Sequence, residues 1–459
     1  MTKLGVLFSV LGVGAGCIPA FAQKQLPNII VMLSDDQGWG DLGFTGNTFV
    51  QTPNIDRIAH EGTILENFYV CPVSSPTRAE FLTGRYHVRS CVNSTTGGGE
   101  RFNLGEKTIA EYFREAGYAT SLFGKWHSGT QYPYHPNARG FEEFYGFCSG
   151  HWGNYWNPVL EHNGEIISGE GFIIDDLTDK ALDYIRDHKE HPFFMFLSYN
   201  TPHSPMQVPD SWWNRVKDRT LSQRATFPEQ EDTTFTKAAL ALAENLDWNI
   251  GRVLSLLHSL DLEQETIVIY FSDNGPNSFR WNGGMKGRKG STDEGGVRSP
   301  FCIRWPGHIR KGAVETQLSG AIDLIPTLLG LAGIEHTPLR KLDGIDWGQR
   351  LLDEKAPAID RVLYSYWGGK TSVRISYYLL DAEDHLYKTD IDRAQRKDVS
   401  DKEPEIYERM KRYSNWFKDE LLADFPKKDT RPFIIGHPQE TYSKPVSYTH
   451  LRAHETVLD

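Results

Sequence analysis

Short runs of apolar residues alternate along this chain with segments in which apolar residues recur every three or four positions. The short runs, bounded by turn residues, predict buried strands, and the helical spacing predicts amphipathic helices. Strands are predicted at Asn28–Leu33, Ile64–Val70, Tyr118–Phe123, Pro192–Tyr199 and Thr266–Ser272. Helices are predicted at Thr52–Gly62, Ser74–Gly84, Thr108–Gly117, Gly171–His188, Phe235–Leu260 and Ala321–Gly333.

This alternation predicts an α/β fold with a large, mixed and mostly parallel sheet that carries helices on both faces. The pattern changes near residue 360. Arg361–Trp367 and Val373–Asp381 are predicted as short strands, and Asp401–Asp424 as a charged helix. We therefore expect a catalytic α/β domain at residues 23–359 and a small C-terminal α+β domain with an antiparallel sheet at residues 360–444.

The first residues have the features of a targeting segment. Lys3 precedes the apolar run Leu4–Ile18, and Ala20–Ala22 offers a small-residue cleavage site. A signal peptide at residues 1–22 predicts an exported, periplasmic protein, and lipid attachment at Cys17 is the alternative. The run is too short to stay as a membrane span, and no later segment is apolar enough to form one.

The last residues, 445–459, differ in pattern from the domain that precedes them. They show no apolar period and do not continue the preceding domain. The stretch PVSYTHLRAHET resembles a translated sequencing adapter, so we expect a non-native tail that begins after Lys444.

Composition and net charge limit the kinds of partner and metal site that this chain can have. The chain has 459 residues, of which 39% are hydrophobic, enough for a sizeable core, and its formal net charge is −11. With that charge and no long basic run, nucleic acid is excluded as a partner. Four cysteines remain after the signal peptide, which allows three disulfide pairings or simple burial, and no Cys/His cluster predicts zinc.

Polar residues follow three of the predicted strands directly: Asp35-Asp36, Asn200 and Asp273-Asn274. In a parallel sheet, ligands bind outside the carboxyl ends of the strands. Carboxylate and amide oxygens suit a hard cation, Ca²⁺ or Mg²⁺, ahead of zinc. Each pair alone is also compatible with ordinary turn chemistry.

Four basic residues fall on the same predicted edge: Lys125, His127, His203 and Lys289. Any one of them is more often a solvated or capping residue than a catalyst. Their common position at the carboxyl ends of the strands favours a catalytic site.

One stretch has a specific resemblance. Ser74-Ser75-Pro76-Thr77-Arg78, followed by Leu82-Thr83-Gly84-Arg85, resembles the signature of the type I, formylglycine-dependent sulfatases, here in its serine form. That family has the alkaline-phosphatase-like superfold. Other segments match it in order along the chain: Asp35-Asp36, Gly124-Lys125-Trp126-His127, Thr201-Pro202-His203, Ser272-Asp273-Asn274-Gly275, Lys289-Gly290-Ser291-Thr292 and Arg304-Trp305-Pro306-Gly307.

The resemblance implies that Ser74 is converted to formylglycine, an aldehyde whose hydrate is the nucleophile, by a serine-type maturase. Cys71 is out of register, because neither Pro76 nor Arg78 lies at the required offset from it. A helix N-terminus favours an anion, and Pro76 in the first turn costs little because its missing N–H would be unpaired there.

Roles for the other residues follow from the same resemblance. Asp35, Asp36, Asp273 and Asn274, with the modified Ser74, would ligate one Ca²⁺. Lys125 and Lys289 would offset the charge on sulfate oxygens, and Arg78 would hold the nucleophile. His127 would accept a proton, and His203, with Lys289, would protonate the leaving alcohol. Lys289 is preferred to Lys286 because it directly precedes the Gly-Ser-Thr block, and Asp293 stands where the family commonly has an aromatic residue.

A cluster of aromatic and amide side chains runs from His151 to Trp156 on a predicted loop. His151, Trp152 and Asn154 are candidate substrate-binding residues, since sugars bind to aromatic faces and planar polar groups. A loop that only packs over the sheet is the alternative. The glycine-rich stretch Thr95–Gly99 is interpreted as a flexible loop.

The leading hypothesis is an exported sulfatase that hydrolyses O-sulfate groups on carbohydrate, a sulfated glycan or glycosaminoglycan. One alternative is a phosphonate or phosphate ester hydrolase of the same superfold. Another is a protein that binds sulfated glycans and never matures its Ser74.

Overall fold

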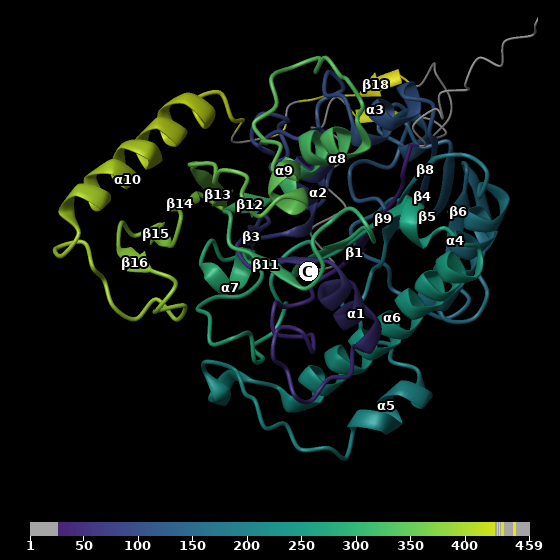
Figure 1. Ribbon diagram of the computed structural model, residues 1–459, viewed down its shortest axis with the longest axis horizontal. Helices are drawn as coiled ribbons and strands as arrows, with labels where there is room; N and C mark the ends of the chain where they lie inside the picture. Colours follow the sequence, from purple (N-terminus) through teal and green to yellow (C-terminus); the bar gives the residue numbers. More distant parts are fainter. Residues whose placement is uncertain (1–25, 427–428, 430, 432, 436–443, 447–459) are drawn as a thin grey trace, which may run out of the picture.

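The computed structural model describes residues 26–426, 429, 431, 433–435 and 444–446 (Figure 1). Within them the main sheet has ten strands. In spatial order these are β11 (Ala313–Glu315), β2 (Thr63–Leu65), β10 (Phe301–Arg304), β9 (Thr266–Ser272), β1 (Asn28–Ser34), β8 (Phe193–Ser198), β4 (Ala119–Lys125), β5 (Glu143–Phe147), β6 (Val159–His162) and β7 (Glu165–Ser168).

The centre of this sheet is parallel. Strands β9, β1, β8, β4 and β5 all run the same way, whereas β10 is antiparallel to β9 and β2, and β6 and β7 form an antiparallel edge. The predicted mixed, mostly parallel sheet is therefore confirmed, and the carboxyl ends of its central strands meet at one edge.

Helices cover both faces of the sheet (Figure 1). On one face pack α2 (Ser74–Thr83), α3 (Ile109–Glu115), α8 (Leu324–Ala332) and α9 (Gly348–Leu352). On the other pack α1 (Pro53–Glu61), α4 (Ile173–Asp187) and α6 (Thr233–Ser259), with α5 (Asp210–Val216) against α6. In β1, Ile29, Val31 and Leu33 face the first layer and Ile30 and Met32 the second. Burial on both sides explains why the strand has no polar alternation.

The C-terminal part forms a separate antiparallel sheet, drawn in yellow-green at the left of Figure 1. Its strands are β13 (Leu363–Trp367), β14 (Lys370–Ile375), β15 (Tyr378–Leu380) and β16 (Leu386–Lys388). Helix α10 (Pro404–Trp416) buries Met410 against this sheet, and the π-helical segment Phe417–Leu421 packs back on Tyr86. The small α+β unit was predicted, and its boundary at residues 359 and 360 stays a prediction.

Two predicted strands are wrong in detail. Ile64–Val70 is divided between β2 in the main sheet and β3 (Phe68–Tyr69), which pairs with β12 (Ser319–Gly320). Asn67 lies at the division, where its side chain donates to Thr316 O and accepts from Arg298. Val373–Asp381 is a hairpin of β14 and β15, because Ser376 has a positive φ of 45° and turns the chain.

Apart from short 3-10 turns, the remaining described elements are α7 (Glu294–Val297) and the paired strands β17 (Phe433–Ile435) and β18 (Lys444–Val446). Of the predicted non-native tail, only its start in β18 is described, and the predicted signal peptide lies outside the described residues. Within the described part of the chain, no helix combines the length and the apolar character needed to cross a membrane.

Candidate active site

Ser74 is the first residue of α2 and is 2% exposed. Val73 before it is extended, with φ −142° and ψ 167°, so the chain turns directly into the helix at this residue. The Ser74 hydroxyl donates to Asp273 Oδ2 at 2.5 Å and accepts from Arg78 Nε at 2.9 Å. His127 Nδ1 lies 3.2 Å from the same oxygen. Three functional groups from separate elements thus converge on one small hydroxyl.

His127 is oriented as a base toward Ser74. Its Nε2 lies 2.7 Å from the carbonyl oxygen of Thr95, which can only accept, so Nε2 carries the hydrogen and the Nδ1 lone pair faces Ser74. Burial, and then the charge of Lys125, lower the pKa of His127 well below its ordinary value. The imidazole is therefore neutral. The backbone at Gly150 passes so close that a Cβ there would lie 2.2 Å from Nε2.

Arg78 links the start of α2 to the ends of three strands. Its guanidinium is fully buried and donates to Asp273 Oδ2 at 3.1 Å, to the Lys125 carbonyl at 2.9 Å and to Ser198 Oγ at 2.6 Å. A planar group with five donors suits this role, which a lysine could not fill. Ser198, the last residue of β8, was not among the predicted site residues, and nothing in its sequence context marks it as one.

The four predicted metal ligands lie together. Strands β1 and β9 are neighbours with Ser34 paired to Ser272, so the residues after each strand are adjacent. Asn274 Nδ2 donates to Asp36 Oδ1 at 2.8 Å, and the Asp36 N–H donates to Asp273 Oδ1 at 3.2 Å. Asp36 has a positive φ of 63°, an unusual conformation for a non-glycine residue that turns the chain sharply after β1.

The donor set fits a hard divalent cation. Three buried oxygens of the predicted metal ligands have no hydrogen-bond donor among the described residues: Asp35 Oδ1, Asp36 Oδ2 and Asn274 Oδ1. Such orphaned acceptors are costly unless a cation or water satisfies them, and an all-oxygen set is what Ca²⁺ or Mg²⁺ prefers. Burial would raise the pKa of Asp35, but Lys125 and His203 outweigh it, so the pKa is lowered and the carboxylate is ionised.

Lys289 and His203 lie on the open side of the site. Their side chains are 24% and 18% exposed, whereas Ser74, Arg78 and Lys125 are almost fully buried. Lys289 Nζ lies 2.6 Å from Asp36 Oδ1, and His203 Nε2 lies 3.6 Å from Asp36 Oδ2. The cluster therefore opens to solvent on the side of Lys289 and His203.

Lys286, three residues before Lys289, does not point toward the predicted metal ligands. Lys286 Nζ lies 3.4 Å from Asp293 and 4.0 Å from Asp381 in the C-terminal unit. Lys125 lies at the closed end, 2.6 Å from Asp35 Oδ2. Of Lys286 and Lys289, the structure therefore brings only Lys289 to the predicted metal ligands.

The three predicted substrate-binding residues, His151, Trp152 and Asn154, differ in what they contact. The His151 ring centroid lies 5.6 Å from that of His203, beside the site. Trp152 stacks on Phe147 at 4.9 Å, and Asn154 accepts the backbone N–H of Trp156. Of the three, His151 lies beside the candidate site, whereas Trp152 makes the packing contact that the alternative interpretation of this loop predicts.

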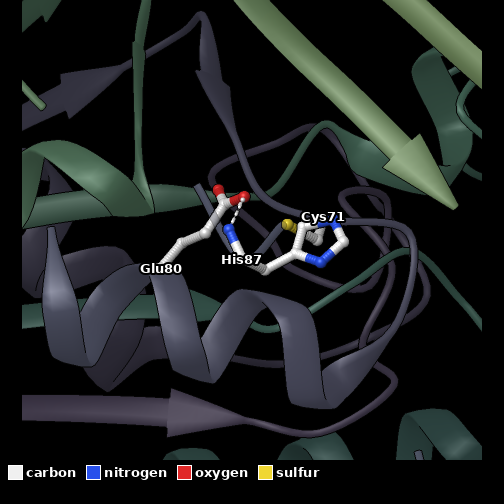
Figure 2. Close-up of side chains that lie close together, drawn as sticks. All are labelled: Cys71, Glu80 and His87. Atoms are coloured by element: carbon white, nitrogen blue, oxygen red, sulfur yellow. Dashed lines mark hydrogen bonds between the residues drawn. The ribbon is translucent and has the colours of Figure 1, made fainter. Parts of the chain in front are cut away.

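Cys71, Glu80 and His87 form a second buried cluster beside α2 (Figure 2). These residue types can hold a metal, but both ring nitrogens of His87 are already engaged: Nδ1 lies 2.9 Å from Val92 O and Nε2 3.1 Å from Tyr366 O. Glu80 accepts a hydrogen bond from the backbone N–H of His87 at 3.1 Å, and the Cys71 thiol is also hydrogen-bonded to Glu80. The cluster links α2 to β13 without needing an ion. Cys71 is a free thiol, as are the other three cysteines of the described chain.

Burial of Glu80 makes stability depend on pH. Burial raises the pKa of Glu80 to about 8, whereas an unfolded glutamate has a pKa of about 4.3. Between these values the folded protein holds the proton more tightly, so the free energy of unfolding falls as the pH rises, by up to about 1.4 kcal/mol per pH unit. Glu80→Gln removes this dependence. We expect its stability relative to wild type to increase from pH 5 to pH 8, measured by urea unfolding.

Glu408→Gln, an exposed substitution in α10, is the control. Its stability relative to wild type should be the same at both pH values. A difference between Glu80→Gln and wild type that does not change with pH would mean that Glu80 is not protonated in the fold.

Comparisons with known proteins agree on one family. A family model described as Sulfatase matches residues 27–334, and one described as N-sulphoglucosamine sulphohydrolase, C-terminal, matches residues 289–424. N-acetylgalactosamine-6-sulfatase of Homo sapiens is 32% identical over 392 residues, 78% of this chain and 70% of that protein, and that of Mus musculus is 31% identical over 80% and 72%. A crystal structure of Ps i-CgsB in complex with k-i-k-neocarrahexaose superposes with a TM-score of 0.77 at 29% identity, over 88% of this chain and 96% of that one.

Proposed function

This chain belongs to the sulfatase family of sulfuric ester hydrolases, and from that premise we propose that it removes O-sulfate groups from a sulfated carbohydrate. The observation that carries the proposal is the convergence of Asp273, Arg78 and His127 on the Ser74 hydroxyl at a helix start. The carbohydrate class is supported by relatives named N-acetylgalactosamine-6-sulfatase and by the similar structure in complex with k-i-k-neocarrahexaose.

The proposal includes maturation of Ser74 to formylglycine by a serine-type maturase. The hydrated aldehyde would supply two hydroxyl groups on one carbon, one to attack sulfur and one to release sulfate afterwards. Arg78 donates a hydrogen bond to the position-74 oxygen, and that hydroxyl donates to Asp273, which is itself paired with Arg78. His127 Nδ1 is the basic atom beside it, and the Thr95 carbonyl keeps the hydrogen on Nε2. His127 is thereby prepared to accept a proton at this position.

Asp35, Asp36, Asp273 and Asn274 would hold the Ca²⁺, which would supply positive charge for a sulfate oxygen and favour ionisation of a hydroxyl. Lys125 pairs with Asp35 and Lys289 pairs with Asp36, so each of these two carboxylates has a lysine beside it. Burial would lower the pKa of Lys289, but Asp36 and Asp35 outweigh it, so the pKa is raised and the ammonium stays charged. Fixed cations in a buried site stabilise charge that develops on sulfate oxygens.

His203 and Lys289 are proposed on the leaving-group side because they are the exposed members of the site. The His203 Nδ1 lies 2.7 Å from Ser204 O and so donates its hydrogen there. Nε2 is then the nitrogen directed toward the site, and it can donate a proton only from the imidazolium form, in which both ring nitrogens carry hydrogen. A sugar alkoxide is strongly basic, so proton donation to it lowers the barrier.

The test is sulfate release by protein co-expressed with a serine-type maturase. We expect turnover of position-defined sulfated monosaccharides, and none by protein made without the maturase. Preference for aryl phosphate diesters over every sulfate ester would instead support a phosphohydrolase. Binding of sulfated sugars without any release by matured protein would support a binding protein.

We further propose that the protein is exported, with residues 1–22 as the signal peptide. The apolar run and the small-residue cleavage site support a periplasmic location, with attachment through Cys17 as the alternative. N-terminal sequencing of the secreted protein distinguishes a start at Gln23 from a modified Cys17.

A further inference from the structure

The loop of residues 286–294, which carries Lys289, is fixed to the catalytic body on one side. The Lys289 N–H donates to Pro276 O at 3.0 Å, and the Gly290 N–H donates to Pro72 O at 2.7 Å. Pro276 comes two residues after Asn274, and Pro72 comes two residues before Ser74. One side of the loop is therefore tied to the segments that carry the nucleophile and the metal ligands.

On its other side the loop is held by the C-terminal unit. Gln395 Nε2 donates to Asp293 Oδ1 at 2.8 Å, and Gln395 Oε1 accepts the Glu294 N–H at 3.0 Å. The Lys286 N–H donates to the carbonyl of Arg393 at 3.2 Å. A side-chain amide can donate and accept at the same time, and both capacities of Gln395 are used on adjacent residues of the loop.

Gln395 differs from its surroundings in two ways. It is 5% exposed, in a segment, residues 390–400, whose other members are exposed or only partly buried. It also has a φ of 51°, which costs energy for a residue with a Cβ and persists where surrounding contacts hold it. Gln395 is held by its side-chain bonds to Asp293 and Glu294 and by the bond from its own N–H to Asp392 O at 3.1 Å.

A buried ion pair also joins the loop to the C-terminal unit, and we call this set of contacts the junction. Arg374 in β14 donates to Glu294 Oε1 at 3.0 Å and to Thr292 O at 2.8 Å, with both charged groups almost fully buried. Glu294 also accepts from Tyr69 at 3.1 Å. Removing the Glu294 carboxylate would leave the Arg374 guanidinium buried without its anionic partner, at a cost of several kcal/mol. A change at the neutral Gln395 leaves this ion pair in place.

We propose that Gln395 is a positioning residue through which the C-terminal unit sets the place of Lys289 over the leaving group. This role rests on the function proposed above, in which Lys289 acts on the leaving-group side of the sulfate. The side-chain hydrogen bonds of Gln395 within the described part of the chain go to Asp293 and Glu294 and not to the predicted metal ligands. It acts by fixing Asp293 and Glu294, four and five residues after Lys289.

The contact can be broken and remade with nearly isosteric changes. Gln395→Glu places a carboxylate against Asp293, so the donated hydrogen bond becomes a repulsion between like charges. In the double variant Gln395→Glu, Asp293→Asn, the amide introduced at position 293 can donate to the carboxylate introduced at position 395. That carboxylate still accepts the Glu294 N–H. Such a cycle separates loss of the contact from loss of either side chain.

The experiment measures kcat/KM of the matured enzyme on a sugar sulfate and on 4-nitrophenyl sulfate, whose leaving group needs little protonation. For Gln395→Glu we expect a loss of about tenfold or more on the sugar sulfate and a much smaller loss on the aryl sulfate. The double variant should recover most of the difference. Arg396→Ala, an exposed neighbour, should match wild type on both substrates.

Hydrogen–deuterium exchange provides a readout that does not depend on activity. We expect faster exchange of residues 286–294 in Gln395→Glu and recovery in the double variant. Unchanged exchange, or equal losses on both substrates without recovery, would overturn the proposal. If wild type hydrolyses neither sulfate, the proposed function fails, and the exchange data still decide whether Gln395 holds the loop.

Discussion

Ser74→Ala is expected to abolish sulfate release and to leave the fold intact. The substitution removes the oxygen on which Asp273, Arg78 and His127 converge. It should cost little stability, because the residue is small and the Arg78–Asp273 ion pair at 3.1 Å remains in place. Sulfate release and thermal unfolding measure the two effects. The mass of the peptide that contains residue 74 adds a third, since formylglycine is about two daltons lighter than serine.

Ser75→Ala is the matched control. Ser75 is also buried in the first turn of α2, but its hydroxyl donates to the Ser94 carbonyl and not into the site. We expect this variant to retain turnover. More than trace turnover by Ser74→Ala would rule out a nucleophile derived from this residue, and an unmodified Ser74 in an active preparation would rule out the maturation step.

Asp273→Ala is expected to lose bound Ca²⁺ and sulfate release together. Asp273 is fully buried at the end of β9, where Oδ1 accepts from the Asp36 N–H and Oδ2 accepts from Ser74 and Arg78. A cation that supplies several kcal/mol of charge stabilisation corresponds to a rate loss on the order of a thousandfold or more. Bound calcium can be measured by mass spectrometry of the metal content, independently of any assay of turnover.

Removing the metal with a chelator and then restoring Ca²⁺ gives a second test of the metal site. Wild type stripped of metal should regain activity when Ca²⁺ is restored, whereas Asp273→Ala should not, and Asp187→Ala, an exposed change at the end of α4, should behave like wild type. If Asp273→Ala keeps one calcium ion per chain and is still inactive, then Asp273 acts on Ser74 alone and does not ligate the metal.

Much of the site could be predicted from sequence because the fold is a parallel sheet. Residues that follow β1 and β9 had to lie near each other once those strands were neighbours, and both strands are recognisable as continuous apolar runs. The Ser-x-Pro-x-Arg spacing likewise places Arg78 one helical turn after Ser74, where its Nε lies 2.9 Å from the hydroxyl.

Other contacts had no signal in the sequence. Thr95 belongs to a stretch interpreted as a flexible glycine-rich loop, yet its carbonyl sets the tautomer of His127. A backbone carbonyl is present at every residue, so no residue type marks the one that is used. The strand predicted over Ile64–Val70 was wrong for a related reason: the partners of Asn67 that end the pairing are 231 and 249 residues away.

The sequence by itself determined the central strands β1, β4, β8 and β9, most of the α-helices, the edge of the sheet at which the candidate site residues meet and the residue that begins α2. These features depend on local periodicity and on spacings within a few residues. Only the tertiary structure decided which polar group each side chain meets. It brought Lys289 to Asp36 and turned Lys286 toward Asp381, and it joined Gln395 to Asp293 across 102 residues of chain. Hydrogen bonds and ion pairs form between whichever groups packing brings within about 3 Å, and that packing depends on the whole core.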